Sequence, residues 1–398
     1  MIAGLSQPHV KKFILEHQDD DPATLLLSAS KYPDVPLREV AAQIKARQKA
    51  KNKIPSWYQS ENIIFPPALA MEQCSSEATA RLKSEWLQGD KLIDLTGGAG
   101  IDTYFLSRRF NRTYYVEKET ELGLLAKHNF ARLQAPRIHV TIMDALDFLK
   151  GDSMPVDWIY IDPARRDDHH ARVFRLSDCQ PDVTLIQDSL FRRADNILIK
   201  TSPMLDIKQA LKELRNVEKV YVVAVRNEVK EVLYAIQKGF EHTPHIHTIN
   251  LKNYEDREIF SYPSDAESTA TVIFDYPKGY LYEPNAAILK AGGFKIIGAC
   301  FGLLKLHPHS HLYTSDRHLK DFPGRKFKIQ AISRLNKKEV LAHIPEGKAH
   351  ITARNFPYSV DMIRKKTGLT PGGDHYVFAT TNMDHKLVLL ICVKFPVD

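Results

Sequence analysis

The segment that most constrains the fold of this 398-residue chain runs from Leu92 to Asp102 and has the sequence LIDLTGGAGID. An apolar run ends at Asp94, glycines follow at positions 97, 98 and 100, and an amphipathic stretch begins. This order predicts a strand, a glycine-rich turn and the start of a helix. Glycines let a backbone pass close to a ligand, and a helix N-terminus offers free N–H groups. The segment therefore predicts a site for a nucleotide-like cofactor.

From residue 91 onward, apolar runs alternate with amphipathic stretches. Such alternation is typical of βαβ units, in which helices cover both faces of a mostly parallel sheet, so the expected fold class is α/β, Rossmann-like. The predicted strands are Lys91–Leu95, Thr113–Val116, Ile138–Met143, Val156–Ile161, Asn196–Lys200 and Lys219–Val225, and the predicted helices include Glu119–Leu133 and Pro181–Ala194. His245–Leu251 and Thr269–Tyr276 are expected to add a late antiparallel hairpin.

The chain is too long for one ordinary core, so several domains are expected. Residues 1–88 carry apolar positions at helical spacing between prolines, which predicts a helical N-terminal region. The predicted sheet domain covers residues 89–276, and Pro277 and Gly279 mark its end. Two small α+β domains are expected at 277–322 and 323–398.

The formal net charge is +7 and the isoelectric point is about 9.0. This excess is compatible with a polyanionic partner such as RNA or DNA, or with a solvated surface alone. Lys45, Lys49 and Lys53 fall on one predicted helix face. Basic residues also surround Phe322 and Phe327, a combination that suits nucleic acid; an amphipathic strand edge is the alternative. These basic residues are Lys320, Arg325, Lys326 and Lys328.

The four cysteines are scattered and form no C-x-x-C pair, which fits a reduced cytosol. The N-terminus has no basic segment followed by an apolar run, and the apolar run Leu387–Val393 is too short to cross a bilayer. A cytoplasmic location without membrane insertion is therefore expected. His307, His309 and His311 would share a strand face, but no carboxylate or cysteine stands at ligand spacing, so no metal site is predicted.

The loop departs from the dinucleotide fingerprint G-x-G-x-x-G, because Thr103 stands where the third glycine is needed. An acidic strand end with glycines at +4 and +6 is instead the pattern of class I S-adenosylmethionine-dependent methyltransferases, which Asp94, Gly98 and Gly100 match. Asp94 would then orient loop amides and the methionine ammonium. Asp102 would cap the helix or contact the methionine part through water.

Acidic residues also end the next two predicted strands. Glu117 stands about 20 positions past the loop, where it can accept hydrogen bonds from both ribose hydroxyls; a surface glutamate is the alternative. Asp144 can accept from the adenine amino group while Ala145 offers its backbone N–H; Asp147 competes for this role but is expected one turn into the helix. The predicted cofactor-binding residues are Asp94, Thr96, Gly97, Gly98, Gly100, Asp102, Glu117, Asp144, Ala145, Gln73 and Thr79.

The fourth predicted strand ends in Asp162-Pro163-Ala-Arg165-Arg166, and ligands bind at the carboxyl ends of parallel strands. This string matches the fourth motif of methyltransferases that modify bases. The lone pair of an exocyclic amine is delocalised into the ring, so the amine is a poor nucleophile. Asp162 and a backbone carbonyl near Pro163 can accept its two N–H bonds and localise that lone pair, without a metal or a covalent nucleophile. An ordinary strand-end turn with proline is the alternative.

Three stretches resemble the bacterial class I methyltransferases that carry a ferredoxin-like domain and a C-terminal THUMP-like domain. They are Glu72–Ala80, Asp94–Asp102 with Asp162–Arg166, and Thr352–Pro357 with Gly368–Asp374. THUMP domains bind RNA in tRNA-modifying enzymes, so the resemblance implies an RNA substrate, tRNA or rRNA. It also implies S-adenosylmethionine as cofactor. Gln73, Ser75, Ser76 and Thr79 precede the sheet and either bond the cofactor carboxylate or belong to a helix with a capping serine.

Two departures from related motifs bear on the target. Arg165 stands where D-P-P-Y enzymes place an aromatic residue, so its guanidinium would stack on the base or bind a phosphate; Tyr160 and Phe174 are the alternative platforms. The D-P-A-R string is also similar to carbon-5 uridine methyltransferases, but Ile199–Pro203 lacks the cysteine that they need. The glycine loop looks like that of guanine-N2 methyltransferases, which favours an exocyclic amine.

The predicted catalytic residues are Asp162, Pro163 and Arg165. A DNA adenine methyltransferase is the first alternative, and the second is a nucleic-acid-binding protein whose methyltransferase fold no longer turns over. Intact glycines and the strand-two acid Glu117 argue against the second alternative. The oligomeric state does not follow from the sequence.

Overall fold

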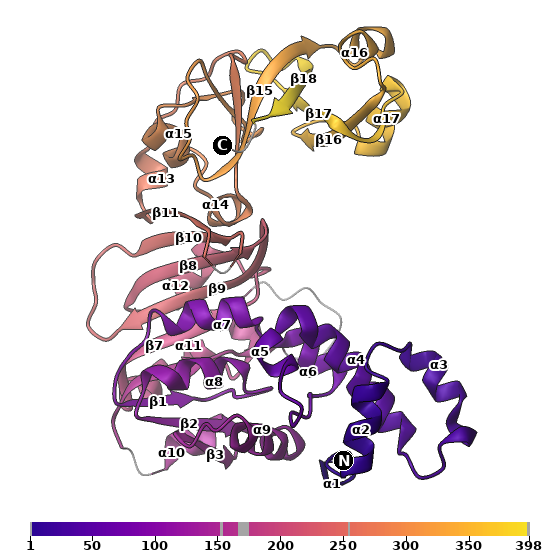
Figure 1. Cartoon of the computed structure of the whole chain (residues 1–398). Coiled ribbons are helices and arrows are strands. Elements are labelled where there is room, and N and C mark those ends of the chain that lie inside the picture. The colour runs from indigo at the N-terminus through magenta and orange to yellow at the C-terminus, as the bar shows by residue number, and fades with distance from the viewer. Residues whose placement is uncertain (1, 152–153, 166–174, 254, 396–398) are drawn as a thin grey trace. The chain divides into compact units, whose positions relative to one another are not determined.

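The computed structural model describes residues 2–151, 154–165, 175–253 and 255–395, and Figure 1 shows the course of the chain. The chain forms two compact units. The first comprises Met1–Val220 and Glu231–His242, and the second comprises Tyr221–Lys230 and Thr243–Asp398. Among the described residues, every helix is too short or too polar to cross a membrane.

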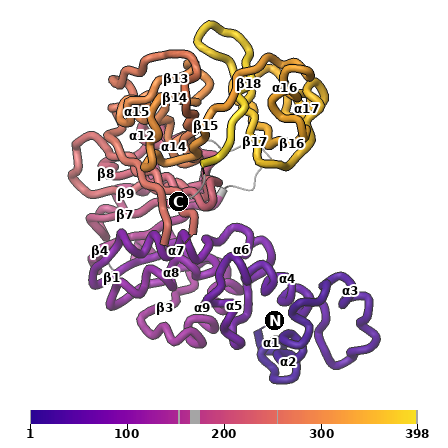
Figure 2. The backbone as a smooth tube through the Cα atoms, turned by 45° about the horizontal axis from the view of Figure 1, so that its top comes forward, coloured from indigo at the N-terminus to yellow at the C-terminus, as the bar shows by residue number. Residues whose placement is uncertain are grey.

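The first unit begins with helices, as the sequence predicts. α4 is the longest of the helices that open this unit, and it buries Val40 and Ile44 against α1, α2 and α3. The helical elements are α1 (Ile2–Leu5), α2 (Pro8–Glu16), α3 (Pro22–Leu27), a 3-10 turn (Ala29–Lys31), α4 (Leu37–Lys53), α5 (Pro55–Tyr58), α6 (Ala68–Gln73) and α7 (Glu77–Ser84). α7 lies beside α8 (Ile101–Leu106) in both views of the backbone (Figure 1 and Figure 2).

A largely parallel sheet follows these helices, with strand order β8-β9-β7-β4-β1-β2-β3 in this part of the chain. Its strands are β1 (Lys91–Asp94), β2 (Arg112–Glu117), β3 (Ile138–Ile142), β4 (Val156–Ile161), β7 (Ala194–Thr201), β8 (Val217–Val225) and β9 (Glu228–Gln237). β1 pairs in parallel with β2 and β4, whereas β9 runs antiparallel to β7. The α/β expectation is therefore confirmed.

Helices connect the parallel strands, so consecutive strand ends meet at one edge of the sheet. The connecting elements are α8, a 3-10 turn (Ser107–Arg109), α9 (Thr120–Arg132), α10 (Ala145–Lys150), a 3-10 turn (Leu176–Asp178), α11 (Val183–Phe191) and α12 (Ile207–Glu213). A short antiparallel ladder, β5 (Ala164–Arg165) with β6 (Cys179–Gln180), follows β4.

The second unit contains an antiparallel pair and a separate seven-stranded sheet. β10 (His245–Leu251) pairs with β11 (Arg257–Pro263), and the larger sheet has the order β13-β14-β12-β15-β18-β17-β16. The elements after β11 are α13 (Ala266–Thr269), β12 (Tyr280–Pro284), α14 (Ala286–Ala291), α15 (Ile296–Phe301), β13 (Leu304–Lys305), β14 (Tyr313–Ser315), β15 (Gly324–Ser333), α16 (Lys337–His343), β16 (Lys348–Arg354), α17 (Val360–Thr367), β17 (Thr370–Thr381) and β18 (Leu387–Lys394).

The predicted late hairpin is wrong in its second strand. The partner of β10 is Arg257–Pro263, whereas Thr269–Tyr276 contributes only an isolated bridge between Phe274 and Lys305. Ile273 is 71% exposed, so the apolar side chains of this segment do not form a buried strand face.

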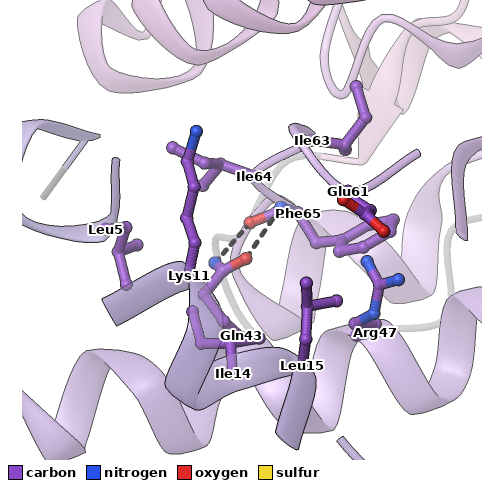
Figure 3. A pocket seen from close by; sticks show the side chains of 10 residues that line it. All are labelled: Leu5, Lys11, Ile14, Leu15, Gln43, Arg47, Glu61, Ile63, Ile64 and Phe65. Atoms are coloured by element: carbon purple, nitrogen blue, oxygen red, sulfur yellow. Dashed lines mark hydrogen bonds between the residues drawn. The ribbon is translucent and has the colours of Figure 1, made fainter. Parts of the chain in front are cut away.

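A small cavity lies among α1, α2, α4 and the segment Glu61–Phe65, lined by the ten residues labelled in Figure 3. Gln43 of α4 is buried there and pairs with the backbone of Phe65. Its Nε2 donates to the Phe65 carbonyl, and its Oε1 accepts from the Phe65 N–H, both at 2.8 Å. One side chain thus satisfies two buried backbone groups and fixes the segment on the helix.

Replacing Gln43 by alanine should destabilise the first unit by about 2–4 kcal/mol, because two buried backbone groups lose their partners. Urea unfolding followed by tryptophan fluorescence measures this loss, since Trp57, Trp86 and Trp158 all lie in the first unit. Gln59→Ala on an exposed position of the same region is the control and should change stability little. Equal midpoints for both variants would contradict the prediction.

Candidate active site

The glycine-rich loop is organised by Asp94 at the end of β1. The Asp94 carboxylate is buried; it accepts the Thr96 N–H at 3.0 Å and the Thr103 hydroxyl at 2.5 Å. Burial raises the pKa of Asp94 to about 7. The carboxylate therefore ties the loop to helix α8, the first of the two roles suggested by its position. A contact with a ligand ammonium stays a prediction.

Two glycines of the loop meet different constraints. A Cβ on Gly97 would lie 2.1 Å from the ring of Tyr115, so only glycine fits beneath the loop. Gly98 has a left-handed φ of +53°, and a Cβ there would find only the Thr96 carbonyl oxygen, at 3.8 Å. The loop thus packs tightly against β2 on one side and leaves open space above Gly98.

Glu117 ends β2 beside this loop. Its Oε2 accepts the Gly98 N–H and its Oε1 accepts the Glu119 N–H, both at 2.8 Å. A carboxylate oxygen has a second lone pair, so both oxygens keep acceptor capacity for hydroxyl groups. The geometry is compatible with the predicted ribose contact and also gives Glu117 a role in holding the loop.

Asp144 follows β3 at the same edge of the sheet. It is the N-cap of α10 and accepts the Leu146 N–H at 2.8 Å, while Ala145 is buried at the first helical position. Asp147 lies within the first turn of α10, slightly nearer its start than expected, and pairs with Lys150 at 2.8 Å. Because β1, β2 and β3 are neighbours, Asp94, Glu117 and Asp144 follow three successive strand ends.

Asp162 follows β4, on the other side of β1. Its N–H donates to the Thr96 hydroxyl at 2.6 Å, so the glycine loop and the D-P segment are joined directly. Lys200 of β7 places its Nζ 2.5 Å from Asp162 Oδ2, and the Asp162 side chain remains 33% exposed. Burial raises the pKa of Asp162, and the Lys200 ammonium opposes that rise. Pro163 is buried.

The structure bears on which residue could stack on a target base; the sequence suggested Arg165, Tyr160 and Phe174. Tyr160 is buried and its hydroxyl donates to Asp102 at 2.7 Å, so the hypothesis that Tyr160 stacks on a base is wrong. The backbone of Arg165 pairs with Cys179 in the β5–β6 ladder. Arg166, Phe174 and the side chain of Arg165 lie outside the described part of the chain.

Behind Asp162 lies a buried charge network that the sequence motifs did not predict. Asp102 Oδ2 accepts from Ser75 and Tyr160 at 2.7 Å each and from Lys200 at 3.4 Å, and Lys83 Nζ is 3.1 Å from its Oδ1. Lys83 is fully buried and also binds both carboxylate oxygens of Glu231 on β9, at 2.7 and 2.8 Å. The network thus joins α7, α8, β4, β7 and β9.

The charges of this network stabilise one another. Burial alone raises the pKa of Asp102, but the ammonium groups of Lys83 and Lys200 outweigh it and hold that pKa below its ordinary value. Burial alone lowers the pKa of Lys200, but the carboxylates of Asp162 and Asp102 outweigh it and raise that pKa. Asp102 therefore does not cap α8: Gly100 is the N-cap, and the Asp102 side chain faces the network.

The segment before the sheet follows the capping alternative. Ser76 is the N-cap of α7 and accepts the Thr79 N–H at 3.2 Å. Thr79 is buried and its hydroxyl donates to the Ser76 carbonyl at 3.1 Å, so this hydroxyl already has a partner in the protein; a cofactor contact through Thr79 stays a prediction. Gln73 is exposed at the end of α6, and its cofactor role stays a prediction. Ser75, the fourth residue of this set, belongs to the charge network.

Several of the basic residues noted in the sequence are already paired. Lys49 pairs with Glu72 at 2.6 Å, and Lys53 donates to the carbonyls that end α6, whereas Lys45 is exposed. In the second unit, Arg325 and Arg354 both pair with the buried carboxylate of Glu283. The predicted lysine face of α4 is therefore partly structural.

The histidine cluster of the second unit is held by hydrogen bonds. His307 is buried, its Nδ1 accepts the His309 N–H at 3.1 Å, and the Asn355 amide lies 2.9 Å from the same nitrogen. Its Nε2 is 3.2 Å from His385 Nδ1. Two donors at Nδ1 favour the neutral imidazole with its proton on Nε2.

The Lys83→Met variant should lose about 3–5 kcal/mol of stability, because Glu231 and Asp102 become buried carboxylates without a full partner set. Unfolding in urea, followed by the tryptophans of the first unit, provides the measurement. The matched control is Lys83→Met combined with Glu231→Gln, which restores the original net charge of the network and should recover most of the loss. Similar stabilities of the single and double variants would rule out the pairing as the cause.

The comparisons with known proteins cover both units. A family model described as a ferredoxin-like domain matches residues 280–323, and one described as THUMP domain-like matches 324–394. A relative from Mycobacterium tuberculosis strain H37Rv, described as an uncharacterized S-adenosylmethionine-dependent methyltransferase, is 23% identical over 313 residues, which are 75% of this chain and 80% of the relative. A crystal structure from Porphyromonas gingivalis W83, described as that of a putative methyltransferase, is 33% identical to this chain, covers 98% of both chains and has a TM-score of 0.86. On this likeness, and with the strand-end site described above, the chain belongs to the same family of methyltransferases.

Proposed function

We propose that this protein transfers a methyl group from S-adenosylmethionine to a base in RNA, and that the acceptor is an exocyclic amine. The observation that carries the proposal is the Asp162 carboxylate. It lies at the carboxyl end of β4, its backbone is bonded to Thr96 of the glycine loop, and it is part-exposed. A carboxylate in this place has a clear use for an amine substrate and little use in a binding module.

The residues around the glycine loop fit the cofactor. The open space above Gly98 admits a ligand, Glu117 keeps acceptor capacity for ribose hydroxyls, and Asp144 with Ala145 follows the next strand. The relative from Mycobacterium tuberculosis is described as dependent on S-adenosylmethionine, which supports the same cofactor here. When bound, the cofactor supplies an electrophilic methyl group on sulfur.

The chain itself orients the nucleophile. Asp162 Oδ2 is engaged by Lys200, and among the described residues Oδ1 has no hydrogen-bond partner. Oδ1 can accept one N–H of the amine, and a backbone carbonyl near Pro163 can accept the other. Fixing both N–H bonds aligns the nitrogen lone pair and removes the need for reorganisation during the reaction.

The preference for RNA rests on the C-terminal domains. Residues 324–394 match a THUMP-like family model, and THUMP domains serve RNA-modifying enzymes, so tRNA or rRNA is the proposed substrate. The net charge of +7 is compatible with a polyanion. A DNA adenine target is the outcome that would replace this proposal.

The deciding experiment compares modified nucleosides in total RNA and in DNA from a strain lacking the protein with those of the wild type. The proposal predicts loss of one N-methylated nucleoside from RNA, restored by the wild-type chain and not by an Asp162→Asn chain. Loss of a methylated base from DNA alone would replace RNA by DNA as the substrate. An unchanged nucleoside profile in both would favour a binding role.

Gly98→Val should abolish binding of S-adenosylmethionine, because the branched side chain fills the open space above the loop in a left-handed backbone conformation. Calorimetric titration of the cofactor measures the effect. Gly239→Val is the matched control. Gly239 also has a positive φ, +79°, and a Cβ at this position would have no heavy atom within 4 Å. The substitution therefore introduces similar backbone strain at a position away from the loop. A folded Gly98→Val protein with unchanged affinity would exclude this loop as the cofactor site.

Asp162→Asn should lower turnover on the order of a hundredfold, as for other preorganised electrostatic sites, and change cofactor affinity by less than about tenfold. In this variant the amide oxygen accepts from Lys200, so the amide NH2 group takes the place of Oδ1. This NH2 group is a donor and cannot accept the N–H of the substrate amine. Single-turnover methylation of RNA from the deletion strain measures this. Asp195→Asn is the control, because Asp195 is 76% exposed near the start of β7. Full activity of Asp162→Asn would refute the amine mechanism.

A further inference from the structure

The buried network suggests a role for a residue that no motif identifies. We infer that Lys200 is a positioning residue of the methyl-transfer site, which keeps Asp162 ionised and leaves its Oδ1 as the acceptor for the substrate amine. This inference rests on the proposed function, since it concerns the same carboxylate. It assigns a role to the lysine that follows the apolar run Ile197–Ile199 in β7, Ala194–Thr201.

The donors of Lys200 are fully used within the protein. Its Nζ lies 2.5 Å from Asp162 Oδ2, 3.2 Å from Ser75 Oγ and 3.4 Å from Asp102 Oδ2. An ammonium group has three N–H donors, so these three partners leave none for a substrate. Lys200 is also only 7% exposed. It therefore acts through Asp162 and does not contact the reacting atoms.

The groups facing Asp162 explain why it needs this lysine. Asp102 on α8 contributes negative charge near Asp162, and Asp94 at the end of β1 adds negative charge once the pH exceeds its pKa of about 7. Lys83 on α7 contributes positive charge from the far side of Asp102. The Tyr160 hydroxyl is neutral and bonded to Asp102. Lys200 is thus the only cation in contact with Asp162 among the described residues.

Removal of Lys200 has a distinctive chemical consequence. Asp162 would face two carboxylates in a largely buried site, and both burial and like charge favour its protonated form. A protonated carboxyl presents an O–H donor to the amine instead of an acceptor. The site would then work only at a pH high enough to ionise Asp162, which a purely structural role for Lys200 does not predict.

The test is the Lys200→Met variant, assayed from pH 6 to pH 9.5 for methyl transfer from S-adenosylmethionine to RNA purified from a strain lacking the protein. We expect the turnover number at pH 7 to fall at least tenfold, and the acid limb of the pH profile to move up by about one unit or more. Cofactor affinity should change less than threefold. A wild-type turnover number with a wild-type pH profile would overturn the inference.

Lys200→Met leaves an extra uncompensated negative charge in the interior and is itself expected to be less stable. The double variant Asp102→Asn, Lys200→Met keeps the net charge of the network, and its reference is Asp102→Asn alone. The double variant should show the same loss at pH 7 relative to that reference. Equal turnover of the two would overturn the inference even if the single variant does not fold.

A second readout does not depend on the substrate. In protein labelled with carbon-13 at the aspartate side-chain carboxyl carbons, the Asp162 resonance is identified by its loss in Asp162→Asn. Its titration midpoint should rise by at least one pH unit in Lys200→Met, and an unchanged midpoint would overturn the inference. If the wild-type protein methylates no RNA, the proposed substrate fails, whereas this titration still decides the role of Lys200.

Discussion

The arrangement of the site depends on the sharing of two buried ammonium groups, those of Lys83 and Lys200, by three carboxylates. Lys83 is fully buried between Glu231 and Asp102, and Lys200 lies between Asp102 and Asp162. Removing charges from water is costly, so such pairs persist only when each ion has several partners in good geometry. Here Ser75 and Tyr160 complete the partner set of Asp102. The network therefore connects five elements, α7, α8, β4, β7 and β9, through buried polar contacts.

This network and the glycine loop meet at helix α8. Asp102, in the first turn of that helix, faces the charges, while Thr103 beside it bonds Asp94 under the loop. Thr96 then bonds the backbone of Asp162. The glycine loop and the Asp162 segment are consequently parts of one hydrogen-bonded assembly. These short, directional hydrogen bonds couple the position of the loop to that of Asp162. Catalysis requires reacting groups to be held within a fraction of an ångström of the productive geometry, and such contacts can provide this precision.

The sequence predicted the features that depend on neighbours along the chain. The alternation of apolar and amphipathic stretches located the parallel strands, and Asp94, Glu117, Asp144 and Asp162 stood where those strands end. Contacts between segments far apart in the sequence could not be predicted. Lys83 and Glu231 are 148 positions apart, and the residues next to each give no sign that the two form an ion pair. Tyr160 shows the same limit. The pattern of apolar and polar residues along β4 does not reveal that the Tyr160 hydroxyl donates a hydrogen bond to Asp102 on α8. The strand expected at Thr269–Tyr276 failed because β-propensity cannot say whether a partner strand is present.

The net charge of the chain also does not predict which part of its surface could bind a nucleic acid. The buried network holds three carboxylates and two ammonium groups, so the residues outside it carry a net charge of +8 within the total of +7. Arg325 and Arg354 form ion pairs with Glu283, and Lys53 donates hydrogen bonds to backbone carbonyls near the end of α6. These cations therefore already have a structural role within the protein. A basic residue that pairs with a buried carboxylate contributes less to counterion release, because the carboxylate offsets part of its positive charge. A surface that binds a polyanion is therefore expected among exposed cations such as Lys45, and counting lysines and arginines along the chain overestimates its charge.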